Sequence, residues 1–270
     1  MTALTLVRNE TIKTTRRPAF WVSALALLGI LTIVMLERQT DDAGPAGFPD
    51  IWSGLIGDVG PIAPFFAAIL VILLVTSEFS FRTARQNVID GLSKNAWFAG
   101  KLLLVPAVAA AFIALMFSVG AVGATFGDVD GAIIRGVDLA VLGGYAAGVV
   151  MLVSAAFMCA MLVRGSGAAM AVFFFYITLL ENLIHLGVGR FSPGARPALG
   201  FLPFNVFVEL IDPKNFDASI LPAQAAAAAA ANQPYEAPTL FDPAALLTAG
   251  ALWTLLFVGV AFLVFRRRDL

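Results

Sequence analysis

Six long apolar segments constrain this chain most strongly. A run of about 20 apolar residues crosses the roughly 30 Å hydrocarbon core of a bilayer as a helix rising about 1.5 Å per residue. Apolar residues make up 60% of the sequence and charged residues only 13%, which is typical of integral membrane proteins. We therefore predict an all-α membrane protein with six transmembrane helices in a single domain, residues 1–270. The expected spans are residues 18–36, 59–77, 96–120, 138–163, 167–188 and 243–265.

The distribution of Lys and Arg predicts the orientation of these spans. Twelve of the 17 basic residues fall in the two termini, the region between the second and third spans, and the turn at residues 164–166. They are Arg8, Lys13, Arg16, Arg17, Arg82, Arg85, Lys94, Lys101, Arg164, Arg266, Arg267 and Arg268. Because cytoplasmic loops are enriched in Lys and Arg, we expect both termini in the cytoplasm. The first apolar run is too long for a signal-peptide core, so we expect it to remain as a span.

A polar, mostly basic stretch, residues 78–101, separates the second and third spans and is called the polar segment below. Phe81, Ala84 and Val88 recur at helical spacing, which predicts a short amphipathic helix over about residues 79–90. Gly91 can adopt the left-handed conformation that ends a helix, and Ser93 can cap the next one. An ordinary interfacial loop is the alternative interpretation.

The remaining connections carry weaker signals. Residues 4–17 mix apolar and basic side chains, as in an amphipathic helix on an anionic leaflet. We expect residues 37–58, rich in Gly, Pro and Asp, to form a loop. The outer connection, residues 189–242, is long enough to need structure of its own. Within it, residues 199–211 predict a re-entrant or interfacial helix, and the alanine run at 225–231 predicts a helical, low-complexity insertion.

Within the spans, Gly144 and Gly148 have the spacing that allows close helix packing, either inside one subunit or between subunits. Phe174 and Tyr176 belong to an aromatic run that could line a path for an apolar substrate or simply face lipid and core. Glu181 and His185 lie one helical turn apart. Ionisable groups at this depth are often functional, so these two could form a gate or a substrate contact. The alternative is that they are solvated or pair with Arg190.

Catalytic and metal-binding motifs are not evident. The single cysteine, Cys159, permits no disulfide within the chain, and the single histidine excludes motifs that need a pair. Ser166 and His185 lie 19 residues apart on one predicted helix, about 28 Å by helical rise, which is too far for a catalytic dyad. The chain also contains no nucleotide-binding GxxxxGK[ST] motif, so we do not expect it to hydrolyse nucleotide by itself. We expect no enzyme activity, no bound cofactor or metal, and no nucleic-acid partner.

The polar segment resembles the first cytoplasmic loop of the permease subunits of ABC-2 type (type V) ABC transporters. Residues at matching places are Glu78, Arg82, Thr83, Gly91, Ser93, Lys94 and Lys101. The start of the chain, with Glu10 and Lys13, looks like the elbow helix of that family, and residues 265–270 look like its usual tail. Leu202-Pro203-Phe204-Asn205 is similar to its short outer helices. The stretch from Arg82 to Asp90 departs from the Gly-Thr and apolar run of many members, which suggests a sub-branch.

The resemblance implies a subunit that pairs with a second copy or a sibling and with two separate ATP-binding cassette subunits in a prokaryotic cytoplasmic membrane. ATP and Mg would bind in those partners, which would dock on a coupling helix in the polar segment. The docking residues it implies are Glu78, Arg82, Thr83, Arg85, Asp90, Gly91, Ser93 and Lys94. We expect an exporter of a hydrophobic or amphipathic substrate. The alternative is a six-span secondary transporter, or a membrane immunity or scaffold protein, that needs no ATPase.

Overall fold

The computed structural model describes residues 10–40, 50–81, 83–126, 134–191, 194, 196–230, 234 and 238–267. Within these ranges the chain is largely helical and contains no β-strand. Six helical stretches are long and apolar enough to cross a membrane: Pro18–Arg38, Ala63–Ser80, Lys94–Ala124, Gly136–Val163, Ser166–Val188 and Pro243–Arg267. The protein is therefore an all-α, multi-pass membrane protein, as the sequence predicted.

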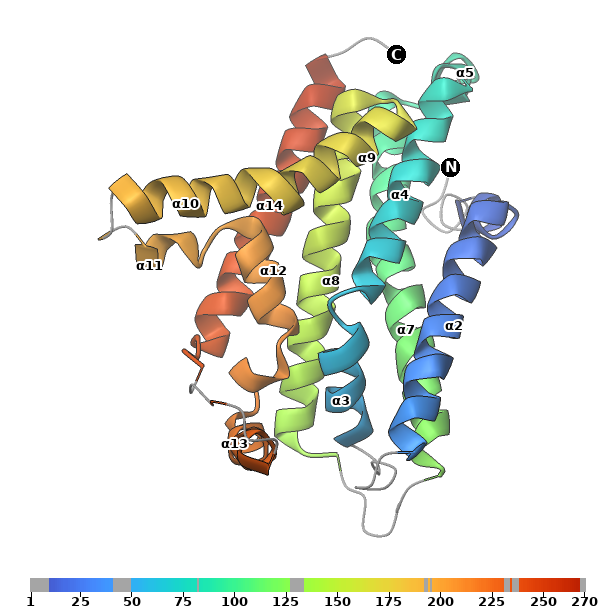
Figure 1. The fold of residues 1–270 in the computed structure, drawn as a ribbon. Coiled ribbons are helices and arrows are strands. Elements are labelled where there is room, and N and C mark those ends of the chain that lie inside the picture. Colours follow the sequence, from blue (N-terminus) through green and yellow to red (C-terminus); the bar gives the residue numbers. More distant parts are fainter. Residues whose placement is uncertain are drawn as a thin grey trace.

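Helix α8 (Gly136–Val163) is the centre of the bundle. It packs against α4 (Ala63–Ser80), α7 (Leu104–Ala124) and α14 (Pro243–Arg267), while α2 (Pro18–Thr40) packs on α4 and α7 (Figure 1). In its most apolar stretch, 61% of α8 is buried, against 17% for α14. The outer faces of α14 and α2 expose large apolar side chains such as Leu255 and Trp21, which suits contact with lipid hydrocarbon.

The structure corrects the predicted boundaries of the second span. Residues 50–58 were expected in a loop, but Asp50–Val59 forms helix α3, which packs against α7. Its Ile51, Leu55 and Val59 recur at helical spacing and are buried, so tertiary packing overrides the Gly and Asp residues between them. The chain turns at residues 60–62, and α4 starts with a proline in its first turn.

The third apolar run is two helices in sequence, α6 (Lys94–Leu102) and α7, and it starts two residues before the predicted boundary. At the opposite end of the chain, Phe265 of α14 stacks on Trp97 of α6 with ring centroids 5.1 Å apart. The end of α14 and the start of α6 therefore lie at one end of the bundle, together with the short helix α5 (Thr83–Ile89) (Figure 1).

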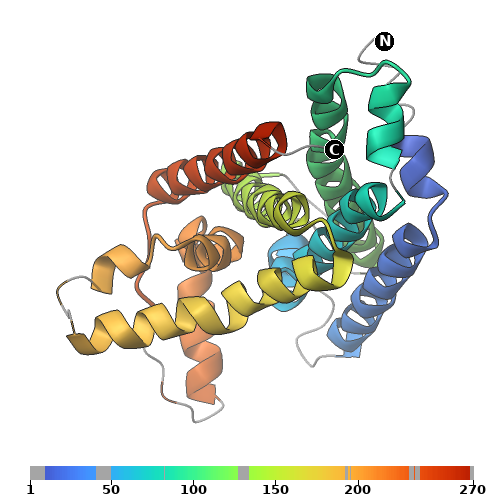
Figure 2. The same ribbon diagram turned by 90° about the horizontal axis from the view of Figure 1, so that it is seen from above.

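The fifth apolar run does not follow the direction of the other helices. Helix α9 (Ser166–Phe175), the π-helix η1 (Tyr176–Leu180) and α10 (Glu181–Phe191) follow one another and lie across the bundle in both views (Figures 1 and 2).

The chain then continues along the bundle through the outer connection. Beyond α11 (Arg196–Leu199), helix α12 (Pro203–Ile211) packs against α8 and α14 (Figure 1). Helix α12 falls within residues 199–211, where the sequence predicted a re-entrant or interfacial helix, whereas α11 lies before that region except for Leu199. Two 3₁₀ turns, η3 (Pro213–Asn215) and η4 (Ala218–Ile220), precede α13 (Leu221–Ala230), which holds most of the alanine run.

Gly144 and Gly148 permit close packing inside this chain. A Cβ at Gly144 would lie 2.4 Å from the Phe216 ring and 2.9 Å from the Leu210 carbonyl oxygen. A Cβ at Gly148 would lie 2.8 Å from Ile211. The two glycines thus let α12 and the turn after it lie directly on α8, which confirms the interpretation of packing within one subunit.

Gly144→Ala should destabilise the bundle, because the added methyl group must displace α12, and overpacking of this kind costs about 1–3 kcal/mol. Gly143→Ala is the matched control, since no atom lies within 4 Å of a Cβ at that exposed position. There the helix propensity of Ala should leave stability unchanged or raise it by up to about 1 kcal/mol. Thermal unfolding in detergent measures both variants, and equal midpoints would contradict the packing argument.

Candidate functional site: a buried charge cluster beneath the polar segment

Four charged side chains from three parts of the chain meet at the α5 end of the bundle, and we call them the charge cluster: Glu10, Lys13, Glu78 and Lys101. The Lys101 Nζ lies 2.7 Å from a carboxylate oxygen of Glu10 and 3.0 Å from one of Glu78. Lys13 lies 3.6 Å from each of the same two carboxylates. Glu78 and Lys101 are each only 2% exposed. Two acids and two bases therefore balance one another in a largely buried site.

Aromatic packing closes the cluster on one side. Trp97 is buried one helical turn before Lys101, and the Lys101 ammonium lies 5.8 Å from its ring centroid. The ring of Trp97 also packs on Phe79 of α4 and Phe265 of α14. An ammonium held against an aromatic face and two carboxylates is stabilised despite its burial. The cluster therefore joins α4, α6 and residues 10–15, which are helical, into one unit.

Helix α5 is attached to this unit at its first residue. The Thr83 hydroxyl, at the start of α5, donates to the Glu78 carboxylate at 2.9 Å. Ala84 is buried, whereas Phe81 is 75% exposed, so Phe81 does not belong to the buried face that the sequence predicted. The predicted helix over 79–90 is thus shorter, and Phe81 lies in the turn after α4.

The end of α5 follows the sequence prediction closely. Gly91 has φ +96°, the Gly91 N–H donates to the Val88 carbonyl, and the Leu92 N–H donates to the Asn87 carbonyl. These two bonds are those of a Schellman motif, which satisfies the last carbonyls of the helix. Ser93 then caps α6 by accepting a hydrogen bond from the Ala96 N–H at 3.2 Å.

The predicted docking residues do not all lie on one exposed surface. Arg85 is exposed on α5 and Asp90 is exposed directly after it, and Asp90 accepts a hydrogen bond from Gln86. Glu78 is buried in the charge cluster, so its carboxylate can position α5 through Thr83 but does not offer a surface to a partner. Lys94 is partly buried at the start of α6. Arg82 lies outside the described residues.

A groove of about 500 Å³ runs beside α5. It is lined by Phe79, Arg85 and the turn between α8 and α9, where Arg164 has φ +61° and stacks its guanidinium 4.9 Å from the Phe79 ring. Two arginines thus flank a cavity formed between the polar segment and the next loop at the same end of the bundle. The sequence placed Arg164 on this side but did not indicate that it stacks on Phe79 of α4 and lines a groove with Arg85.

Glu181 performs a structural task at the junction between η1 and α10. Its side chain is 2% exposed and accepts hydrogen bonds from the backbone N–H groups of Phe204 and Asn205, at 3.1 and 2.9 Å. The Asn205 side chain adds a third bond at 2.7 Å and lies 2.7 Å from His185 Nε2. The α12 N-cap residue, Leu202, has no side-chain oxygen to offer, so Glu181 caps α12 from 23 residues away. The interpretation of Glu181 as solvated or paired with Arg190 is wrong.

Phe174 and Tyr176 have separate roles. Phe174 stacks on Phe65 of α4, with ring centroids 6.0 Å apart. Tyr176 lies close to Glu181 and presents its ring to an apolar cavity. The structure therefore groups Tyr176, Glu181 and His185 around the start of α12 and places Phe174 in core packing.

No group of three His, Cys, Asp or Glu that could hold a metal ion occurs in the described part of the chain. The fold and the charge cluster define a multi-pass helical membrane protein with a short polar helix attached to one end.

The sequence matches the family described as "Protein of unknown function (DUF2705)" over residues 44–188, more than half of the chain, so the protein belongs to that family. The match includes the whole polar segment. Comparison with curated proteins gave no match.

Lys101→Met should strongly destabilise the protein, because it leaves the Glu10 and Glu78 carboxylates facing each other without their nearest cation. Removing one partner of a buried ion pair costs about 3–5 kcal/mol. The measurement is thermal unfolding in detergent. The triple variant Lys101→Met, Glu10→Gln, Glu78→Gln should recover much of the loss, because no buried charge is left unbalanced. Equal stability of the single variant and the wild type would show that the cluster does not hold these elements together.

Proposed function

We propose that this protein is the membrane-spanning permease subunit of an ATP-driven exporter of the ABC-2 type, with α5 as the helix on which a separate ATP-binding subunit docks. The observation that carries the proposal is the attachment of α5. The helix exposes the charged side chain of Arg85, Asp90 is exposed directly after it, and the first residue of the helix is hydrogen-bonded to Glu78 in the charge cluster. A force applied to α5 would therefore reach the bundle directly.

The cluster distributes such a force over several elements. Glu78 belongs to α4, and Lys101 belongs to α6 at the start of the third span. Glu10 and Lys13 belong to the helical residues 10–15, called the N-terminal helix below. A displacement of α5 without these elements would break the hydrogen bond from the Thr83 hydroxyl and take one partner from the buried Glu78 carboxylate. The proposal is that ATP binding closes two ATP-binding subunits, that α5 moves with them, and that the spans follow as a two-state element biased by nucleotide.

The proposal assigns ATP and Mg to the partner chains and no chemical step to this chain. Two ATP-binding cassette subunits and a second permease, either another copy or a sibling, would complete the transporter. Both termini and α5 would lie in the cytoplasm, since Glu10, Phe265 and α5 share one end of the bundle and this end holds most of the Lys and Arg residues. The substrate would be hydrophobic or amphipathic.

Secondary transport or a scaffold role is less well supported. Secondary transporters usually carry ionisable groups for ion or substrate binding near the middle of the membrane. Glu181 and His185 are residues of this kind in the fifth apolar run. The Glu181 carboxylate oxygens already accept three hydrogen bonds from α12, and His185 Nε2 lies 2.7 Å from the Asn205 side chain of the same helix. These bonds give Glu181 a structural role in capping α12.

Charge reversal in the polar segment, Arg82→Glu with Arg85→Glu, should abolish co-purification of the ATP-binding partner and leave the protein inserted in the membrane. The measurement is an affinity pull-down from the native membrane in mild detergent, with mass spectrometry and an ATPase assay on the eluate. A partner with nucleotide-binding motifs should accompany the wild type and be lost from the double variant.

Arg190→Glu serves as the control, because Arg190 is an exposed cation on α10, outside the polar segment. This variant should retain the partner. Normal co-purification with the Arg82→Glu, Arg85→Glu double variant would overturn the docking assignment. A wild-type oligomer free of ATPase, isolated after crosslinking in the membrane, would favour the secondary-transporter or scaffold function instead.

A further inference from the structure

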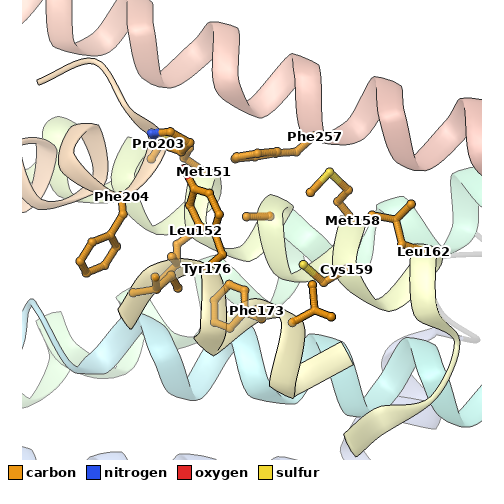
Figure 3. A pocket seen from close by; sticks show the side chains of 13 residues that line it. Met151, Leu152, Met158, Cys159, Leu162, Phe173, Tyr176, Pro203, Phe204 and Phe257 are labelled. Carbon is orange, nitrogen blue, oxygen red and sulfur yellow. The ribbon is translucent and has the colours of Figure 1, made fainter. Parts of the chain in front are cut away.

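An apolar cavity of about 150 Å³ lies where α9 and η1 cross the second half of α8 (Figure 3). The wall from α8 includes Met151, Met158 and Cys159, and Phe257 of α14 lies on another side. Phe173 and Tyr176 approach from α9 and η1, and the start of α12 completes the lining (Figure 3). The cavity exists because the fifth apolar run passes across the bundle instead of lying along α8.

The lining offers almost no polar group to a ligand. Of its thirteen residues only Tyr176 and Cys159 carry a hydrogen-bond donor in the side chain. The Tyr176 hydroxyl lies close to the Glu181 carboxylate, and a thiol is a weak hydrogen-bonding group. Water needs two to four polar partners to remain in a cavity, whereas an apolar cavity of about this size stays dry and accepts a benzene-sized molecule. The occupant that fits is a hydrocarbon group of about six carbon atoms.

The rim of the cavity is apolar and faces outward. Val172 lines the cavity and is 46% exposed, and Phe175, in the next helical turn of α9, is 52% exposed. In a membrane protein such an outward apolar face meets lipid hydrocarbon, so a chain from the bilayer can reach the cavity without crossing water. Met151 and Met158 have flexible, polarizable side chains that adapt to the shape of what they contact.

We propose that this cavity binds the end of an acyl chain of a membrane phospholipid, inserted between α8, η1 and α14. The chain would fill a space that the protein's own side chains leave empty, and it would support the crossing of α9 and η1 over α8. This inference does not depend on the ATP-driven transport proposed above, because it requires this chain and a lipid bilayer alone.

The test uses a phosphatidylcholine with a photoactivatable diazirine at the end of one acyl chain, mixed into nanodiscs that contain the purified protein. After irradiation, mass spectrometry maps the crosslinked residues. Labelling should concentrate on the cavity lining in α8 and η1, several-fold above the lipid-facing positions of α14 such as Leu255. Labelling spread evenly over exposed apolar residues would overturn the proposal.

Two variants on α8 sharpen the test. Ala155→Phe places a ring in the cavity and should reduce labelling of the lining at least several-fold, whereas Ala140→Phe, at an exposed position outside the cavity, should leave the labelling unchanged. Size-exclusion profiles establish that both variants are folded, and Ala155→Leu replaces Ala155→Phe if the larger ring prevents folding. Undiminished labelling of the lining in the folded, filled variant would contradict acyl-chain binding in this cavity.

Discussion

The structure depends on one ion network, in which the ammonium of Lys101 lies between the carboxylates of Glu10 and Glu78. Removing an ion from water costs several kcal/mol even in a real protein interior, and the cost is offset only while the opposite charges remain in contact. The buried charges stay in contact only while α4, α6 and the N-terminal helix keep their relative positions. The ion network therefore holds these three helices in one arrangement. Because Thr83 is bonded to the same network, the short polar helix α5 shares that arrangement.

Glu181 is a second buried acid, and backbone N–H groups instead of a cation offset the cost of burying it. Glu181 is balanced by the backbone N–H groups at the start of α12, where the positive end of the helix dipole favours a carboxylate. This contact holds α12 near the junction of η1 and α10, and the glycines of α8 allow α12 to lie close. The same arrangement leaves the apolar cavity under η1. Two buried carboxylates thus position the short helices α5 and α12, at which the structure departs from a simple bundle.

Local sequence signals predicted much of this fold. Six apolar runs indicated the six helical stretches that are long and apolar enough to cross a membrane. Gly91 and Ser93 marked the end of α5 and the start of α6, because a left-handed turn and a helix cap depend on neighbouring residues only. Helix α3 was missed because its buried face forms only on packing against α7. The contact between Glu181 and α12 joins residues 23 positions apart, and the cluster joins Glu10 to Lys101, 91 positions apart. No pattern within a sequence window reveals such pairs, nor that α9 and α10 lie across the bundle.

The central claim is that the charge cluster fastens α5 to the bundle. Hydrogen–deuterium exchange in nanodiscs tests it most directly, comparing wild type with the Lys101→Met variant at a temperature where both remain folded. The account predicts that amide protection falls together in residues 10–15 and in α5, while α12, which Glu181 caps independently, exchanges as before. Unchanged protection of α5, or an equal loss in α12, would contradict a specific connection between the cluster and the polar segment.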